Sequence, residues 1–98
     1  MFIPTVGNDG VPFEARDFKA FEAAAVRLFG GVTRLPGLAT GSWLDETEKL
    51  FRDRSRQYLV AMGSLTEGDK LAQLVRFAKE HFAQKAIYVR YLGLSEII

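Results

Sequence analysis

Three arginines stand at alternate positions of one segment, at Arg52, Arg54 and Arg56. Side chains alternate between the two faces of an extended strand, so the three guanidinium groups would share one face at spacings of about 7 Å. Guanidinium groups bind carboxylate and phosphate oxygens through paired hydrogen bonds. The row therefore predicts an anion-binding surface, and a weak nucleic-acid site is the last-ranked form of it. The alternative is a solvated strand face whose arginines pair with the acidic residues of segment 45–48.

A second group of residues surrounds the only tryptophan, Trp43. A hairpin turn centred near Glu48 would place Trp43 opposite Asp53, and Gly41 opposite Ser55, on one face. An indole, a carboxylate and a hydroxyl can line a pocket for a small organic or anionic ligand, and Gly41 would leave room for it. The alternative is structural, with Trp43 covering the edge of the core while Asp53 accepts a hydrogen bond from the indole or the backbone.

The residues also permit an alternative reading as a cofactor-free enzyme. In that reading Asp53 is the general base, and Tyr88 or His81 is the proton donor. His81 is the only histidine and the chain has no cysteine, which excludes thiolate nucleophiles, disulfides and Cys-ligated zinc. Phosphate-binding glycine motifs are absent as well. We therefore expect no cofactor and no metal, and a structural role for His81 near a helix end.

The composition bounds the remaining possibilities. The chain has 98 residues, of which 48% are hydrophobic, and a formal net charge of +1. This predicts one domain over residues 1–98 and no overall field that would draw it to nucleic acid or an anionic membrane. The N-terminal segment lacks the apolar run of a signal peptide, and no apolar stretch approaches 18 residues. We therefore expect a cytoplasmic protein that does not contact a membrane.

The hydrophobic periodicity predicts two helices and four strands. Phe18, Phe21 and Ala25 recur at helical spacing, which predicts a helix over 14–29 that ends at Gly30. A second helix is expected from an N-cap at Thr66 to about residue 83. Strands are expected at 2–6, 38–44, 50–62 and 86–92, followed by a short tail over 94–98.

The order β-α-β-β-α-β predicts a ferredoxin-like plait of the α+β class, in which two helices cover one face of a four-stranded antiparallel sheet. The other face must be solvated, bind a ligand or pair with another sheet. A core this small also favours self-association. We therefore expect a homodimer formed through a sheet face or edge. The apolar residues expected in that contact are Tyr58, Val60 and Met62, or the tail residues Ile97 and Ile98.

Four short motifs occur in order along the chain, namely Gly31-Val32-Thr33, Gly41-Ser42-Trp43, Asp53-Arg54-Ser55 and Phe82-Ala83-Gln84. Their order and spacing resemble a bacterial family of small proteins of unknown function with the same β-α-β-β-α-β layout. Residue 53 is Asp where that family usually has Glu. The resemblance implies the fold and a ligand site near Trp43, Asp53, Ser55 and Gln84, and it implies no activity.

Together these observations predict a non-enzymatic binding or assembly module that forms a homodimer. A small molecule is the expected ligand beside Trp43.

Overall fold

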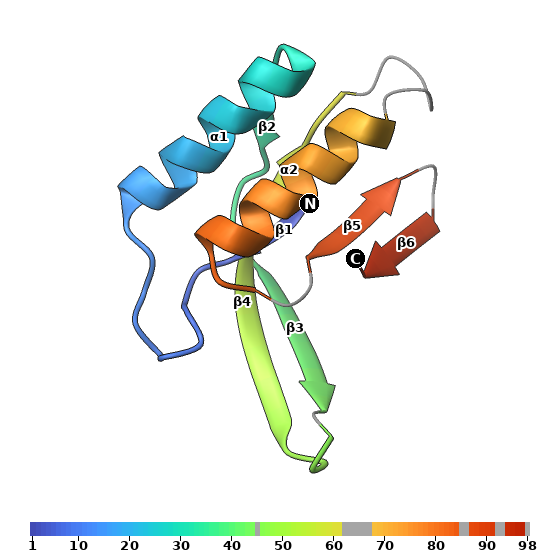
Figure 1. The fold of residues 1–98 in the computed structure, drawn as a ribbon. Helices are drawn as coiled ribbons and strands as arrows, with labels where there is room; N and C mark the ends of the chain where they lie inside the picture. The colour runs from blue at the N-terminus through green and yellow to red at the C-terminus, as the bar shows by residue number, and fades with distance from the viewer. Residues whose placement is uncertain (45, 62–67, 85–86, 92–93, 98) are drawn as a thin grey trace.

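The computed structural model describes residues 1–44, 46–61, 68–84, 87–91 and 94–97. Two helices and an antiparallel sheet form it, which confirms the α+β class (Figure 1). In chain order the elements are β1 (Phe2–Pro4), α1 (Ala15–Phe29), β2 (Thr33–Arg34), β3 (Ala39–Leu44), β4 (Leu50–Leu59), α2 (Gly68–His81), β5 (Tyr88–Tyr91) and β6 (Leu94–Ile97).

The sheet is organised around β4, its longest strand. The strand order is β2-β4-β1-β5-β6, and β3 also pairs with β4. Every pairing is antiparallel. One end of β4 lies between β1 and β2, whereas the other end pairs with β3. Figure 1 shows β3 and this end of β4 extending together beyond the two helices.

Helix α1 has clear signals at both ends. Asp17, in the first turn, accepts a hydrogen bond of 2.9 Å from the backbone N–H of the N-cap residue Glu14. This contact satisfies a donor that the helix leaves free, and it puts negative charge at the positive end of the helix dipole. Gly30 ends the helix with a left-handed φ of 83°, which glycine adopts without a steric penalty.

The helices cover one face of the sheet and enclose the core against it (Figure 1). The apolar faces predicted for them are confirmed, since Phe18 and Phe21 of α1 and Leu74 and Ala78 of α2 are buried. The strand residues Ile3, Tyr58 and Val89, together with Ile87 directly before β5, belong to the same core. In the part of the chain that the structure describes, no helix has the length and apolar character needed to cross a bilayer.

Two strands depart from the sequence prediction. Residues 94–97, expected as a tail, form β6 and pair with β5. This assignment was missed because four residues are too few for a periodic signal to emerge. Thr33–Arg34 form the short strand β2, which the sequence analysis did not predict. The expected N-cap Thr66, together with Met62 and Ile98, lies outside the described residues.

Candidate functional site

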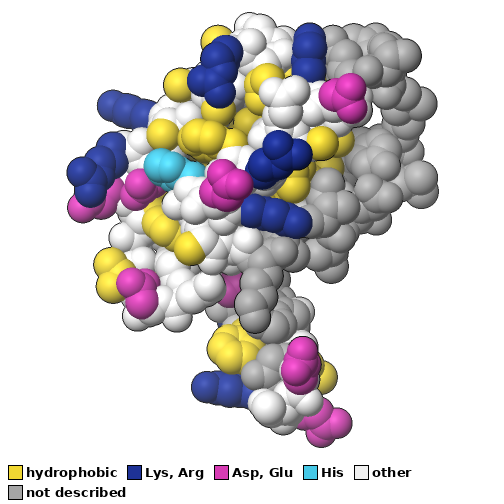
Figure 2. Space-filling model, viewed as in Figure 1, with side chains coloured by type: hydrophobic (Ala, Val, Ile, Leu, Met, Phe, Trp, Pro, Cys, Tyr) yellow, Lys and Arg dark blue, Asp and Glu magenta, His cyan; other side chains and the backbone are white. Residues whose placement is uncertain are grey.

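The β3–β4 hairpin, residues 39–55, carries five of the nine site residues that the sequence singled out. Thr5, directly after β1, contacts the base of the hairpin, because its N–H and its Oγ1 both donate to the Arg54 carbonyl at 2.9 Å. Towards the turn from that point, the named pairings of β4 are with β3. The side chains of Leu44 and Leu50 near the turn are 61% and 53% exposed. The hairpin therefore reaches into solvent with hydrophobic and charged side chains on it (Figure 2).

The register of this hairpin differs from the expected one. Trp43 lies opposite Phe51 rather than Asp53, and Asp53 lies opposite Gly41. The turn is centred on residue 47, not near Glu48, which instead takes a left-handed φ of 64° within it. Sequence reasoning missed this because a positive φ at Glu, unlike one at Gly or Asn, leaves no compositional signal.

The shift of two residues preserves the period-two alternation. Gly41, Trp43, Asp53 and Ser55 therefore still occupy positions on one face of the two strands. Asp53 is exposed and Ser55 is half-buried. The Trp43 side chain lies outside what the structure describes, so the pocket beside it stays a prediction.

The arginine row divides between two environments. Arg52 and Arg54 lie exposed on the hairpin, opposite Ser42 and Thr40. Arg56 instead sits under α1, where its guanidinium carbon is 3.9 Å from the centre of the Phe18 ring. Its side chain is 24% exposed. Arg56 therefore stabilises the helix–sheet contact, and two of the three predicted anion-binding arginines remain together in solvent.

A polar network accompanies Arg56 at the edge of the core. The Tyr58 hydroxyl donates to Glu22 Oε2 at 2.8 Å, and the same oxygen is 4.0 Å from an Arg56 nitrogen. Burial is the main cause that raises the pKa of Tyr58 above its usual value. Sequence reasoning did not single out Glu22. Its position next to Phe21, at the margin of the helix's apolar face, is the signal that would have indicated it.

The expected role of Tyr58 in a dimer contact is wrong. Its side chain is 1% exposed and lies against Phe21, with ring centres 5.0 Å apart. The alternation of β4 points it at the helices, so it belongs to the core of one chain. Val60 is half-buried and packs against the same core. Met62 and Ile98 lie outside the described residues, as does the side chain of Ile97.

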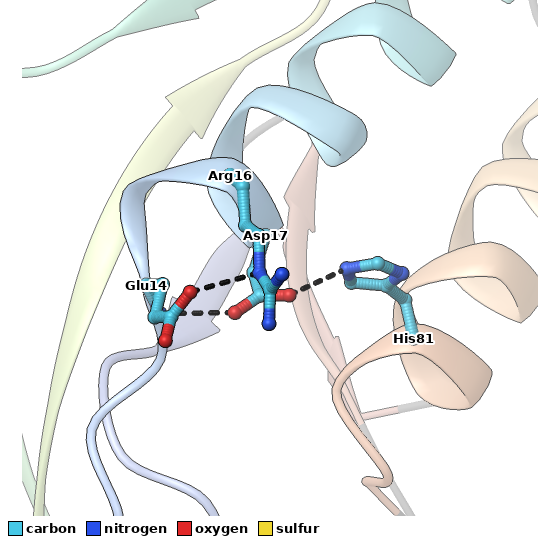
Figure 3. A network of polar contacts seen from close by, with 4 residues as sticks. All are labelled: Glu14, Arg16, Asp17 and His81. Atoms are coloured by element: carbon cyan, nitrogen blue, oxygen red, sulfur yellow. Dashed lines mark hydrogen bonds and ion pairs between the residues drawn. The ribbon is translucent and has the colours of Figure 1, made fainter.

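His81 links the end of α2 to the start of α1 (Figure 3). Its Nε2 is 3.1 Å from Asp17 Oδ1, and its ring stacks on Phe77 with centres 5.3 Å apart. The Glu14 backbone N–H is the main cause that lowers the pKa of Asp17, and the His81 contact lowers it further. The arrangement holds two helix ends together, which fits the structural role expected for His81.

The residues of the enzymatic alternative lie on different elements. Asp53 is on the hairpin, whereas His81 ends α2 and contacts Asp17. The side chain of Tyr88 lies outside the described residues. Catalytic roles for these three residues therefore stay predictions. Within the ranges described, no three His, Asp or Glu side chains are grouped to hold a metal.

Gln84 serves the C-terminal end of α2. Its backbone N–H donates to the Lys79 carbonyl at 2.8 Å, and its side-chain amide donates to the Phe82 carbonyl at 2.9 Å. These bonds satisfy carbonyls that the helix end leaves free. The ligand role that the motif resemblance implies for Gln84 stays a prediction.

A shallow depression of about 300 Å³ lies on the surface of α2, and the described residues that line it are Ala72, Val75, Arg76 and Lys79. None of these four described residues carries a carboxylate, hydroxyl or imidazole, so they add no candidate site for chemistry. Comparisons with protein-family models, with curated proteins and with solved structures found no match. The resemblance to a bacterial family therefore rests on the four motifs alone.

Proposed function

We propose that this chain is a homodimeric assembly module and that the β3–β4 hairpin is its contact surface. The observation that carries the proposal is a two-stranded ribbon that extends beyond the helices with exposed leucines on it. An isolated two-stranded ribbon is marginally stable in water, because it buries little apolar surface. A second copy would supply the burial that the helices do not provide there.

Three exposed leucines lie along this hairpin, one at its base and two near its turn. Leu38, directly before β3, is 48% exposed, and Leu44 and Leu50 lie opposite each other near the turn. By the alternation of the strands, all three occupy the same face as the exposed Arg52 and Arg54. An apolar set of this kind beside charged residues is typical of a contact between proteins.

We also infer that the fold is a ferredoxin-like plait whose second strand is interrupted. Leu35 donates its N–H to the Gln57 carbonyl, and β3 begins at Ala39 opposite Ser55. The intervening Pro36 and Gly37 then act as a bulge between two pieces of one strand. If β2 and β3 are counted as that one strand, the first four strands follow the order second, third, first, fourth. β6 is then an addition to the far edge.

Sedimentation equilibrium at micromolar concentrations tests the proposed function. The wild type should show twice the mass of one chain, and Leu44→Lys should shift the protein towards the monomer because it puts a charge into the contact. Leu59→Lys is the matched control, since Leu59 is a comparably exposed leucine (57%) at the other end of β4. A wild type that stays monomeric would overturn the proposal. Loss of the dimer in Leu59→Lys but not in Leu44→Lys would move the contact away from the hairpin.

A further inference from the structure

We propose that two copies join through the free edges of β3, which pair antiparallel into one continuous sheet with Gly41 on the two-fold axis. This inference rests on the proposed function, because it specifies how the dimer forms.

The backbone hydrogen bonds show which groups of β3 face outward. The backbone N–H of Tyr58 donates to the Met1 carbonyl, and the Arg54 carbonyl accepts from Thr5. The backbone N–H and C=O groups of the even-numbered residues of β4 therefore point towards β1. The Gln57 carbonyl accepts from the Leu35 N–H, so the backbone groups of the odd-numbered residues of β4 point to the opposite side. The backbone groups of Asp53 and Gly41 therefore point at each other, and the backbone groups of the residues on either side of Gly41 point away from β4.

Thr40, Ser42 and Leu44 consequently present their N–H and C=O groups along the outer edge of β3. Among the residues described, no strand pairs with that edge. Each exposed strand edge of this kind is a template for another strand.

The composition of β3 leaves this edge unprotected. Natural edge strands usually carry a lysine, another charge, a proline or a bulge that blocks pairing. The segment Ala-Thr-Gly-Ser-Trp-Leu over 39–44 contains neither a charge nor a proline. Pro36 and Gly37, with a φ of 75° at the glycine, interrupt the same edge only before β3 begins. The protection therefore stops where the free edge starts.

Two-fold symmetry restricts the register. With a two-fold axis perpendicular to the sheet, the same face of both copies lies on the same side of the joined sheet. Residues that pair across the axis must therefore both be odd-numbered or both be even-numbered. Near the middle of β3, either Gly41 pairs with the partner's Gly41 or Ser42 pairs with the partner's Ser42.

The side chains favour the register centred on Gly41. It places Leu38 opposite the partner's Leu44, which extends the existing pair of Leu44 and Leu50 into a row of three leucines at each end of the contact. It also places Glu46, at the turn, opposite the partner's Pro36 and two residues from the partner's Arg34, and these two charged side chains are exposed and of opposite sign. The register centred on Ser42 would instead place Leu38 opposite the partner's Glu46.

The centre of the contact also has the necessary space. A Cβ built on Gly41 meets nothing within 4 Å. Because Gly41 directs its own N–H and C=O at Asp53, two copies of it would form a non-hydrogen-bonded pair with Cα atoms about 4.5 Å apart.

Disulfide cross-linking tests the register, because the chain has no cysteine and each variant carries a single thiol. Under mild oxidation Gly41→Cys should give a covalent dimer, since a Cα separation of about 4.5 Å suits a disulfide. Ser42→Cys is the matched control on the adjacent exposed residue. In the proposed register its two copies lie one residue to either side of the axis, so their Cα atoms are about 8 Å apart and beyond disulfide reach. Strong cross-linking of Ser42→Cys without that of Gly41→Cys would overturn the register.

A proline substitution tests edge pairing itself. Ser42→Pro removes an N–H that points outward, so the fold of one chain should persist while the dimer dissociation constant rises about tenfold or more. Ser42→Ala should leave that constant within about twofold. If the wild type is a monomer, the proposed function fails. If the wild type dimerises, Ser42→Pro keeps full affinity and Gly41→Cys does not cross-link, then β3 pairing fails while the dimer stands.

Discussion

The two halves of β4 lie in different surroundings although both carry arginine on the same face of the strand. The half that ends at Leu59 lies between β1 and β2 under the helices, where Tyr58 is buried and Arg56 covers the Phe18 ring. The half that begins at Leu50 is the hairpin, where Arg52 and Arg54 are exposed. Arginines at the same two-residue spacing therefore lie in different environments, because the helices cover only one half of β4.

This difference shows where the stability of one chain arises. Aromatic rings from three segments meet beneath the helices, including Phe13, Phe18 and Phe82 with ring centres 4.9 to 6.4 Å apart. On the hairpin, Phe51 has the Lys49 ammonium 5.2 Å from its ring centre and is only half-buried. The helix-covered region buries its apolar side chains within one chain, whereas the hairpin would gain most of its burial from the second copy in the proposed dimer.

The largest expected effect compares one phenylalanine from each region. Phe82 is fully buried, so Phe82→Ala should lower the free energy of unfolding by about 3–5 kcal/mol. Phe51→Ala should cost less, about 2 kcal/mol at most, since Phe51 is only half-buried and its loss includes the cation–π contact with Lys49. Urea denaturation at low protein concentration measures both. Equal losses would break the contrast between the two regions.

A smaller effect compares two arginines of the same row. Arg56→Ala removes a guanidinium that lies on Phe18 and covers apolar surface, and it should cost about 1–2 kcal/mol. Arg52→Ala, on the exposed face of the hairpin, should change stability by less than about 0.5 kcal/mol. Thermal unfolding of both variants gives the comparison. A larger loss in Arg52→Ala would show that the hairpin carries stability of its own.

The Tyr58 hydroxyl tests the edge of the helix-covered region, where it bonds to Glu22. Tyr58→Phe should cost about 0.5–1.5 kcal/mol at neutral pH, because it removes the bond to Glu22. The pKa of Tyr58 is raised by burial, so the folded state prefers the neutral hydroxyl. This contribution is fully present below the usual pKa of 10.0 and is lost as the pH rises through the folded-state pKa. The difference between wild type and Tyr58→Phe should therefore shrink in alkaline solution, and a pH-independent difference would contradict it.

The smallest effect concerns the helix ends. The pKa of Asp17 is lowered from its usual value of 3.8, chiefly by the Glu14 backbone N–H and then by His81. A lowered folded-state pKa contributes stability that is present above the usual value and is lost as the pH falls through the folded-state pKa. Asp17→Asn should therefore lower the melting temperature slightly at neutral pH and not at all in strong acid. An equal loss at both extremes would show that the carboxylate charge plays no part.

The sequence predicted the fold best where apolar residues recur regularly. Both helices lie close to where their apolar spacing and the glycine after α1 placed them, because those signals act within a few residues. The grouping of residues by strand face survived as well, since it depends only on period-two alternation.

Features that depend on tertiary contacts were not predictable in this way. Whether Arg56 or Arg52 lies under a helix is decided by where the helices end, and nothing near either residue in the sequence indicates it. The same is true of Tyr58, which alternation places on one face without saying that α1 covers that face. The predicted register of the β3–β4 turn was wrong for a local reason, because Glu48 takes a left-handed φ that its residue type does not indicate.

The short span of the β3–β4 hairpin has a consequence for the order in which the chain folds. Its paired residues are separated by 6 to 16 positions, whereas the pairs between β1 and β4 are more than 50 apart. Hairpins close in about 1–10 μs, while distant pairings must first overcome the entropy of closing a long loop. We therefore expect this ribbon to form before the core that supports it. During that interval a newly made chain would already expose its open strand edge to other copies. Correct and incorrect strand pairing would therefore compete most strongly where many chains are made close together.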